Sequence, residues 1–311
     1  MPINKTPINV KTKEFELTNP KYSFDDVVLT VEAENEIKLA LGLYVNAEEI
    51  YGEWGLDSVV KRRKGMSINL YGPSGTGKTI TAHAIANILN KQMLFVNYGE
   101  IESKFVGETA KNLQKMFDYA NENDVVIIFD EADALLSKRV SSMTNATDVS
   151  VNQTRNVLLR LLDEYSNPIV FTTNFIKNYD KAFFRRITTH ISIGYPDYDI
   201  RKKLWDRYLV SEERLESSRS DLLNFLAEIE KVTGADIENC VIKAVTRAVL
   251  VGKKVIGLED IQRELESIQK VNQIDRLGSM GSDYSVSTHT VSKDYVEEKL
   301  ATGGIIDGVT K

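Results

Sequence analysis

A run of eight residues in the first third of the chain has the types and spacing of a phosphate-binding loop. The run GPSGTGKT, at positions 72–79, matches the pattern G-x-x-x-x-G-K-[ST]. Glycines in such a loop let backbone N–H groups converge on phosphate oxygens, and the helix N-terminus that follows adds partial positive charge. The pattern therefore predicts an ATP site formed by Gly72, Pro73, Ser74, Gly75, Thr76, Gly77, Lys78 and Thr79.

Polar side chains at this site are expected to supply the chemistry. In a loop of this kind Lys78 reaches the β- and γ-phosphates, and the Thr79 hydroxyl binds Mg²⁺. Asp130 and Glu131 follow the apolar run VVIIF at 125–129. We expect Asp130 to hold Mg²⁺, directly or through water, and Glu131 to polarise the attacking water. Such a pair can also simply cap a helix, but its combination with the loop favours Mg²⁺-dependent ATP hydrolysis.

A further polar residue, Asn174, ends the apolar run PIVFTT at 168–173. An asparagine in this position is often only a turn residue. Beside a phosphate site it can instead hydrogen-bond the γ-phosphate or the attacking water. The sequence leaves both interpretations open.

Short apolar runs alternate with helical patterns around these residues. The expected strands are 67–71, 93–97, 125–129, 168–173 and 191–193. The expected helices between them are 79–89, 108–120 and 154–165. This alternation predicts a parallel sheet with flanking helices, whose carboxyl edge gathers the phosphate loop, the acidic pair and Asn174.

The chain divides by composition into four expected parts. They are a flexible N-terminal arm at 1–23, an α/β domain at 24–194, a small all-helical domain at 195–270 and a mobile or partner-docked tail at 271–311. In the third part strand patterns stop, and helices are expected at 199–210, 220–231, 235–250 and 258–269.

Composition excludes several other classes of protein. The 311 residues carry a formal net charge of -6 with a pI near 5.4, which argues against nucleic acid as the main ligand. The one cysteine, Cys240, excludes an intrachain disulfide and is expected in the core. No secretory signal or run of 18 apolar residues is found, so we expect a cytoplasmic protein without a membrane segment.

Together these motifs resemble the AAA family proper of the AAA+ ATPases over residues 24–265. Phe24-Asp25-Asp26-Val27 resembles its entry motif, and this implies that the backbone at Val27 lies near adenine. GPSGTGKT is similar to its Walker A motif, with Ser74 where a second proline is usual, and DEADALLSKR at 130–139 resembles its Walker B region. The resemblance implies a P-loop sheet followed by a small helical lid.

Two further segments continue the resemblance. VFTTNFIKNYDKAFFRRI at 170–187 is similar to the family's second region of homology, which implies that Asn174 is a sensor and that Arg185 and Arg186 are fingers for a neighbouring subunit's ATP. The later Gly-Arg-Phe-Asp of the usual pattern is missing, so one or both arginines could act, or both could form surface salt bridges. GADIENCVIKA at 234–244 resembles the lid motif, which implies that Gly234 and Ala235 approach the nucleotide.

The segment KFVGE at 104–108 resembles the family's pore loop, which implies that Phe105 and Val106 grip an extended polypeptide. A core position is the alternative for Phe105. The resemblance implies a ring, typically a hexamer, that threads or remodels a protein, and compact bacterial members remodel HORMA-domain proteins in anti-phage operons. The rival interpretations are a nucleic-acid motor or clamp loader, disfavoured by the acidic charge, and a nucleotide-dependent switch without unfolding activity.

Overall fold

The computed structural model describes residues 15–59, 65–97, 109–136, 146–174 and 179–278. By its internal contacts the chain forms two compact units, 1–265 and 266–311. Every element that lines the site discussed below belongs to the first unit.

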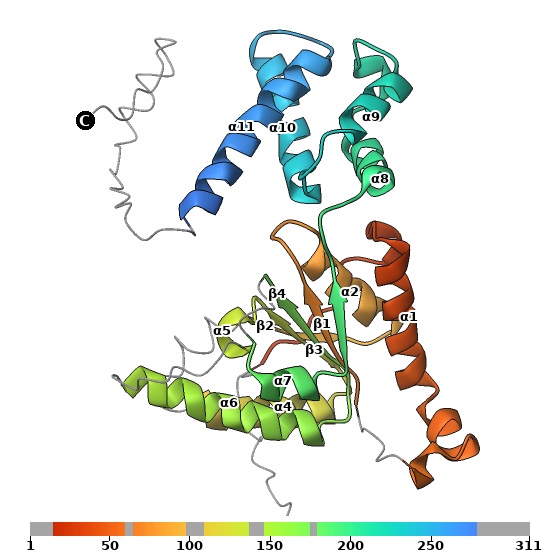
Figure 1. Cartoon of the computed structure of the whole chain (residues 1–311), viewed down its shortest axis with the longest axis vertical. Coiled ribbons are helices and arrows are strands. Elements are labelled where there is room, and N and C mark those ends of the chain that lie inside the picture. Colours follow the sequence, from red (N-terminus) through yellow and green to blue (C-terminus); the bar gives the residue numbers. More distant parts are fainter. Residues whose placement is uncertain (1–14, 60–64, 98–108, 137–145, 175–178, 279–311) are drawn as a thin grey trace, which may run out of the picture. The chain divides into compact units, whose positions relative to one another are not determined.

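Five parallel strands form one sheet, as the alternation of apolar runs and helical patterns predicts (Figure 1). Their order across the sheet is β2-β3-β4-β1-β5, so the phosphate-loop strand β1 lies between β4 and β5. The strands are β1 Ser67–Tyr71, β2 Met93–Asn97, β3 Val126–Asp130, β4 Ile169–Thr173 and β5 Thr189–Ser192. Because all pairs are parallel, the carboxyl ends of β1, β3 and β4 meet at one edge.

The helices of the first unit's sheet-containing part are α1 Val31–Val45, α2 Lys78–Ile88, α4 Thr109–Glu122, α5 Asp133–Leu136, α6 Ala146–Glu164 and α7 Lys181–Arg186. Short 3₁₀ and π turns lie at 24–26, 49–53 and 56–58. The sequence did not indicate α1, α5 or α7, and α6 begins eight residues before the expected 154. Thr30 caps α1 by accepting a 3.2 Å hydrogen bond from the N–H of Ala33.

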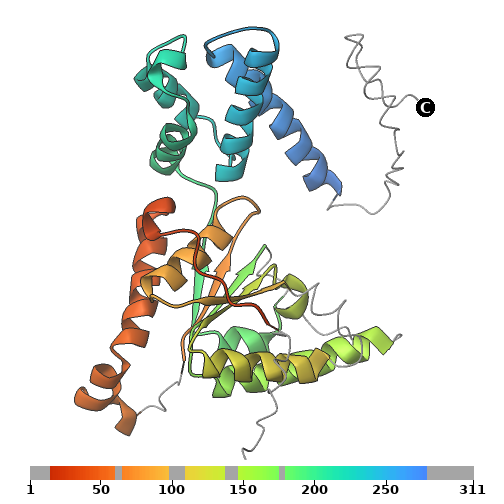
Figure 2. The ribbon, with the colours of Figure 1, turned by 180° about the vertical axis from the view of Figure 1, so that it is seen from behind.

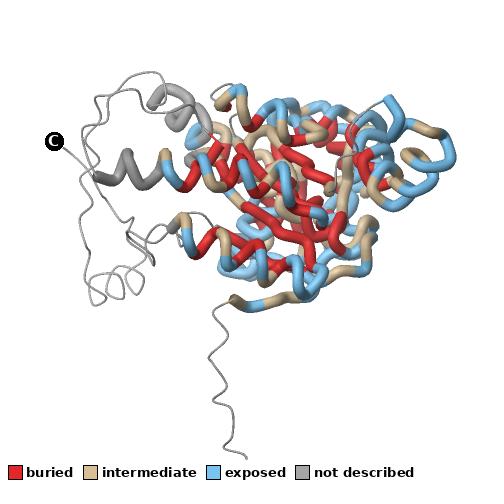
Figure 3. The backbone as a smooth tube through the Cα atoms, turned by 90° about the horizontal axis from the view of Figure 1, so that it is seen from below, coloured by how far each residue is buried: buried red, intermediate tan, exposed pale blue. Residues whose placement is uncertain are grey.

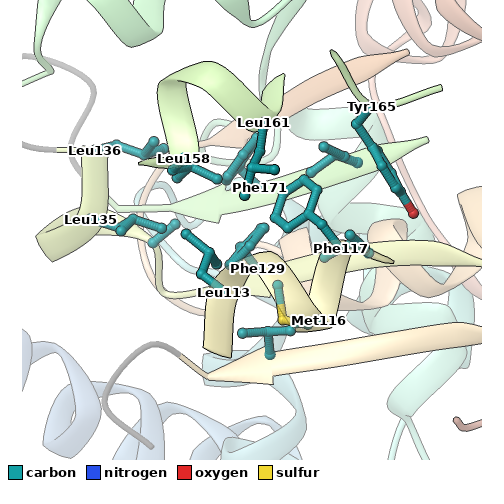
Figure 4. Close-up of a cluster of buried hydrophobic side chains, with 14 of the residues drawn as sticks. Leu113, Met116, Phe117, Phe129, Leu135, Leu136, Leu158, Leu161, Tyr165 and Phe171 are labelled. Atoms are coloured by element: carbon teal, nitrogen blue, oxygen red, sulfur yellow. The ribbon is translucent and has the colours of Figure 1, made fainter. Parts of the chain in front are cut away.

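Helices cover both faces of the sheet, so the core has two layers (Figure 3). One layer lies between the sheet and α4, α5, α6 and α7, and Figure 4 shows its aromatic centre. There Phe129 of β3 and Phe171 of β4 stack at 5.2 Å, and Tyr165 meets Phe117 edge-on at 5.0 Å. The second layer packs α1 and α2 on the other face. Burial on both faces explains the buried apolar runs of β3 and β4.

Residues 15–23, which belong to the expected flexible arm of 1–23, contact the sheet-containing part. Thr18 pairs with Met93 at the edge of the sheet through two backbone hydrogen bonds of 2.8 and 2.9 Å. Phe15 packs on the first core layer, 5.7 Å from the ring of Tyr119. This segment, red in Figure 2, is therefore part of the fold, because an open strand edge and an apolar surface fix its polar residues in place.

Among the described residues after Tyr195 there is no strand, as expected, but only a single bridge between Leu215 and Ile256, a 3₁₀ turn at 212–214 and α-helices. The helices are α8 Tyr198–Tyr208, α9 Arg219–Ala227, α10 Gly234–Leu250 and α11 Leu258–Gly278. Helix α11 continues past residue 270, where the tail was expected to begin. Cys240 lies fully buried on α10, which confirms its core position, and burial raises the pKa of its thiol. In the part of the chain that the structure describes, no helix is long and apolar enough to cross a membrane.

Candidate functional site

The phosphate loop lies between β1 and α2, where the sequence placed it. Gly77 precedes α2 with a φ of +97°, in the left-handed region that glycine tolerates. Gly72 has a φ of +152°, and a Cβ there would lie 2.0 Å from the carbonyl oxygen of Ile193. The N–H of Gly72 also donates to the carbonyl of Thr173, at 3.2 Å, and so ties the loop to the end of β4. Only glycine fits this close approach.

The Lys78 ammonium is buried inside the loop. It donates hydrogen bonds of 2.9 and 2.7 Å to the carbonyl oxygens of Gly72 and Pro73. An ammonium has three donors, so these two bonds leave one for an anion. Burial lowers the pKa of Lys78, and the carboxylates of Asp133, Asp130 and Glu131 oppose that shift.

The two residues expected to hold Mg²⁺ lie side by side. The Thr79 hydroxyl donates a hydrogen bond of 2.9 Å to the Oδ1 of Asp130. The hydroxyl of Thr172, on the adjacent strand β4, donates to the same carboxylate oxygen. Thr79 is on α2 and Asp130 ends β3, so the fold brings together residues that are 51 positions apart.

Glu131 has a left-handed backbone, with a φ of +51°. This conformation costs a non-glycine residue about 1–2 kcal/mol. Its N–H donates to the Thr172 hydroxyl at 3.1 Å, and the next N–H, of Ala132, donates to the Thr172 carbonyl at 2.9 Å. Because of this left-handed backbone, the Glu131 side chain does not continue the alternation of side chains along β3. It is exposed and lines the cavity.

Asn174 lies at the same edge and lines the cavity. Its N–H donates to both carboxylate oxygens of Asp133, each at 3.1 Å. Sequence reasoning missed both Asp133 and Thr172 as supporting residues. The third acid of DEAD and the paired threonines before Asn174 were the available signals.

A cavity of about 290 Å³ opens above these residues, at the lower end of the size range of small-molecule sites. Its lining includes the loop from Ser74 to Thr79, the acidic pair, Asn174 and the predicted Val27. Gly72 and Pro73 do not line the cavity. Their carbonyl oxygens accept hydrogen bonds from Lys78, which does line it. Arg207 of α8 donates to the carbonyl oxygens of Asp25 and Asp26, and so ties the segment before Val27 to the helical part.

The start of α10 reaches the phosphate loop, as the resemblance implies. Gly234 and Ala235 line the cavity, and the N–H of Ala235 donates to the carbonyl of Gly75 at 3.2 Å. A Cβ on Gly75, where φ is +78°, would lie 2.8 Å from the Thr233 hydroxyl. Thr233 and Asp236 cap α10 reciprocally, which fixes its first turn against the loop.

The two arginines at the end of α7 differ in their surroundings. The Nε of Arg186 donates to Asp163 of α6 at 2.9 Å, and the side chain also bonds the carbonyl of Ala182. Arg185 is exposed. Neither arginine lines this chain's own cavity.

ATP and Mg²⁺ fit the residues gathered here. The loop cannot accept a Cβ at Gly72, and apolar side chains such as Val27, Ile200 and Leu204 offer a surface for a base. Mg²⁺ is usually held by one or two carboxylates together with substrate phosphates and water, and Asp130 with Thr79 matches that donor set. Within the described ranges, no cluster of three or more His, Cys, Asp or Glu could hold a metal alone.

The expected pore-loop residues, Phe105 and Val106, lie outside the described residues, as does the end of the Walker B segment after residue 136. Their roles stay predictions.

Comparison with known proteins agrees with this geometry. The family model described as "ATPase family associated with various cellular activities (AAA)" matches residues 68–195. A proteasome-activating nucleotidase of Saccharolobus islandicus is 31% identical over 280 residues, which cover 88% of this chain and 67% of that protein. The proteasome-activating nucleotidase of Saccharolobus solfataricus is 31% identical over 279 residues, with the same coverage of both chains. Proteasome-activating nucleotidase 1 of Haloferax volcanii is 29% identical over 259 residues, which cover 81% of this chain and 62% of that protein. The chain belongs to the AAA family of ATPases, which are enzymes that bind and hydrolyse ATP.

Proposed function

We propose that this ATPase works as a ring of identical subunits, with six as the expected number, and that it remodels or threads a protein substrate. The proposal is supported by its similarity to nucleotidases whose name states that they activate the proteasome. It is also supported by an arginine-bearing helix that lines no part of the chain's own cavity.

The observation that carries the hydrolytic part is the 2.9 Å bond between Thr79 and Asp130 beside the phosphate loop. In this proposal Lys78 binds the β- and γ-phosphates, Thr79 and Asp130 hold Mg²⁺, and Glu131 takes a proton from the attacking water. Mg²⁺, when bound, neutralises charge that develops on the phosphates. Asn174, whose N–H is held by Asp133, orients that water or the γ-phosphate.

Arg185 is the proposed finger for the neighbouring subunit, and Arg186 anchors the helix that carries it. The role of Arg185 is proposed from its exposure, and that of Arg186 from its bond to Asp163. A guanidinium supplied in this way stabilises charge in the transition state and is worth about 10³–10⁵ in rate. Isolated subunits should therefore hydrolyse ATP slowly.

The substrate is proposed from the resemblance to compact bacterial members of the family. Phe105 and Val106 would grip a polypeptide in the axial channel, and a HORMA-domain protein is the proposed substrate. ATPase stimulation by a purified HORMA-domain protein tests the second point. Stimulation by polynucleotides instead would favour a nucleic-acid motor, and a monomer with slow, unstimulated turnover would favour a switch.

Mixing two inactive variants tests the ring and the finger together. Lys78→Ala should lose ATP binding, whereas Arg185→Ala should bind ATP and fail to hydrolyse it. In mixed oligomers some interfaces join an intact cavity to an intact finger, so activity should reappear. The matched control is Arg186→Ala, which should by itself retain more ATPase activity than Arg185→Ala. If mixed oligomers form without activity, the trans role is wrong.

A further inference from the structure

A hydrogen-bonded chain of polar side chains lies on the face of the sheet that α7 covers. It consists of Tyr179 before α7, Thr173 at the end of β4, Asn69 in β1 and His190 in β5. Asn69 is fully buried and Thr173 is 1% exposed. Asn69 and His190 are direct partners in the register of β1 and β5, so their side chains leave the sheet on the same face. Groups this deep stay buried only if they are hydrogen-bonded.

The position of the His190 proton and the orientation of the Asn69 amide follow from one fixed acceptor. The Nε2 of His190 lies 3.1 Å from the carbonyl oxygen of Phe184, which can only accept, so Nε2 carries the proton. Nδ1 of the same ring then accepts from the Asn69 amide nitrogen, at 3.5 Å. The Asn69 oxygen then accepts, and the hydroxyls of Thr173 and Tyr179 lie 3.3 and 3.0 Å from it and 2.5 Å from each other. Every member of the chain therefore has a hydrogen-bond partner.

One end of this hydrogen-bonded chain of side chains lies next to the ATP cavity, and the other lies next to the proposed finger, Arg185. At one end Thr173 directly precedes Asn174, which lines the ATP cavity. At the other end the His190 ring stacks on Phe184, with centroids 4.2 Å apart and planes 10° apart, and Phe184 directly precedes Arg185.

Helix α7 depends on such contacts for its position. It has six residues, and a helix of that length has little stability of its own. Its first turn is capped by Asp180 and its last carbonyl, of Arg186, accepts from the Ser67 hydroxyl at 3.2 Å. His190 is the side chain that holds the carbonyl immediately before Arg185.

We propose that His190 and Asn69 are positioning residues, which hold α7 so that Arg185 meets the ATP site of the neighbouring subunit. The inference rests on the proposed trans role of Arg185. Displacing a catalytic group by about 1 Å can cost about 10²-fold in rate, so loss of the His190 contacts should be visible in turnover.

The mixing experiment separates this role from general stability. A donor subunit carries Lys78→Ala and supplies the finger, and an acceptor subunit carries Arg185→Ala and supplies the cavity. His190→Ala in the donor should lower kcat of the mixed oligomer at least tenfold with KM for ATP unchanged. The same substitution in the acceptor should change kcat less than twofold. His190→Gln in the donor, whose amide can still donate to the Phe184 carbonyl, should restore most of the rate.

Two controls keep the outcomes distinct. His83→Ala in the donor alters a histidine of α2, on the other face of the sheet, and should leave the rate unchanged. If His190→Ala does not fold, Phe184→Ala in the donor removes the stacking partner and should give the same loss. Inactivity of the parent pair would refute the trans role itself. An active parent pair with an unaffected His190→Ala donor, or equal losses in donor and acceptor, would refute only the positioning role.

Discussion

The backbone N–H of Glu131 donates a hydrogen bond of 3.1 Å to the hydroxyl oxygen of Thr172 on the neighbouring strand. The same hydroxyl donates to Asp130, so one side chain joins the proposed metal-binding and water-activating positions. Glu131 adopts a left-handed backbone at this point. The bond to Thr172 helps to hold that conformation, which neither strand nor helix geometry would favour.

Replacing Thr172 by valine should therefore weaken catalysis more than binding. A net hydrogen bond is worth about 1 kcal/mol, and about 1.4 kcal/mol corresponds to a tenfold change in rate, so we expect kcat to fall by about fivefold. The affinity for ADP without Mg²⁺ should stay the same. Thr172→Ser, which keeps the hydroxyl, is the control and should remain near the parent rate; an unchanged kcat in Thr172→Val would contradict the linking role.

Glu131→Gln should retain ATP binding and nearly abolish hydrolysis. The amide has the shape of the carboxyl group but cannot take a proton from water, so ATP should stay bound intact. General-base catalysis contributes about 10²–10⁴-fold, which sets the expected loss. Binding is measured with a fluorescent ATP analogue and turnover by phosphate release. Turnover close to that of the parent chain would remove Glu131 from the mechanism.

Gly72→Ala should destabilise the protein even without nucleotide. The new Cβ would overlap the backbone carbonyl of Ile193, which cannot rotate away as a side chain could. Overpacking of this kind costs about 1–3 kcal/mol or more. Gly194→Ala is a close control, because its Cβ would meet nothing within 4 Å. Thermal melts of both variants without ATP test this, and Gly72→Ala should melt at the lower temperature. Equal melting temperatures would contradict the close approach of Gly72 to the Ile193 carbonyl.

The sequence predicted the sheet and the phosphate loop well, because these depend on local signals. Apolar runs of five residues identify strands buried on both faces, and glycines at 72 and 77 mark positive φ angles. Helix α1 was missed for a physical reason. Its core face holds Ile37 and Leu41, but its outer face also carries Leu39 and Leu43, so no polar stripe marks the period.

The missed parts of the site depend on neighbours that are distant in sequence. Thr172 acts on Asp130 and Glu131 only because β4 lies beside β3, and Asp133 meets Asn174 only because α5 turns back over the same edge. Likewise, Arg186 of α7 has an ion-pair partner, Asp163 of α6, that lies 23 positions away in the sequence.

Stability should fall in mild acid because two histidines are held neutral. Burial is the main cause that lowers the pKa of His83 and of His190 below the ordinary 6.5. Nδ1 of His83 accepts a hydrogen bond from the N–H of Lys21, which also requires a neutral ring. The unfolded chain binds protons first as the pH falls below 6.5, so the free energy of unfolding decreases there and is unaffected above it. Melting temperatures at pH 7.5 and 5.5 measure this, and His190→Gln should reduce the difference.

Phe105→Ala distinguishes threading from a nucleotide switch. If the ring grips a polypeptide, a large apolar contact of roughly 150–250 Å² is lost, while the phosphate loop, the metal-binding residues and the finger are unchanged. Basal ATPase activity and assembly should then persist, whereas unfolding of a protein substrate and its stimulation of ATPase should be lost. If Phe105 is a core residue instead, truncation should cost about 3–5 kcal/mol and depress every activity together. A thermal melt, a basal ATPase assay and an unfolding assay on the same preparation separate the two cases, because only the core position links a large fall in melting temperature to loss of hydrolysis.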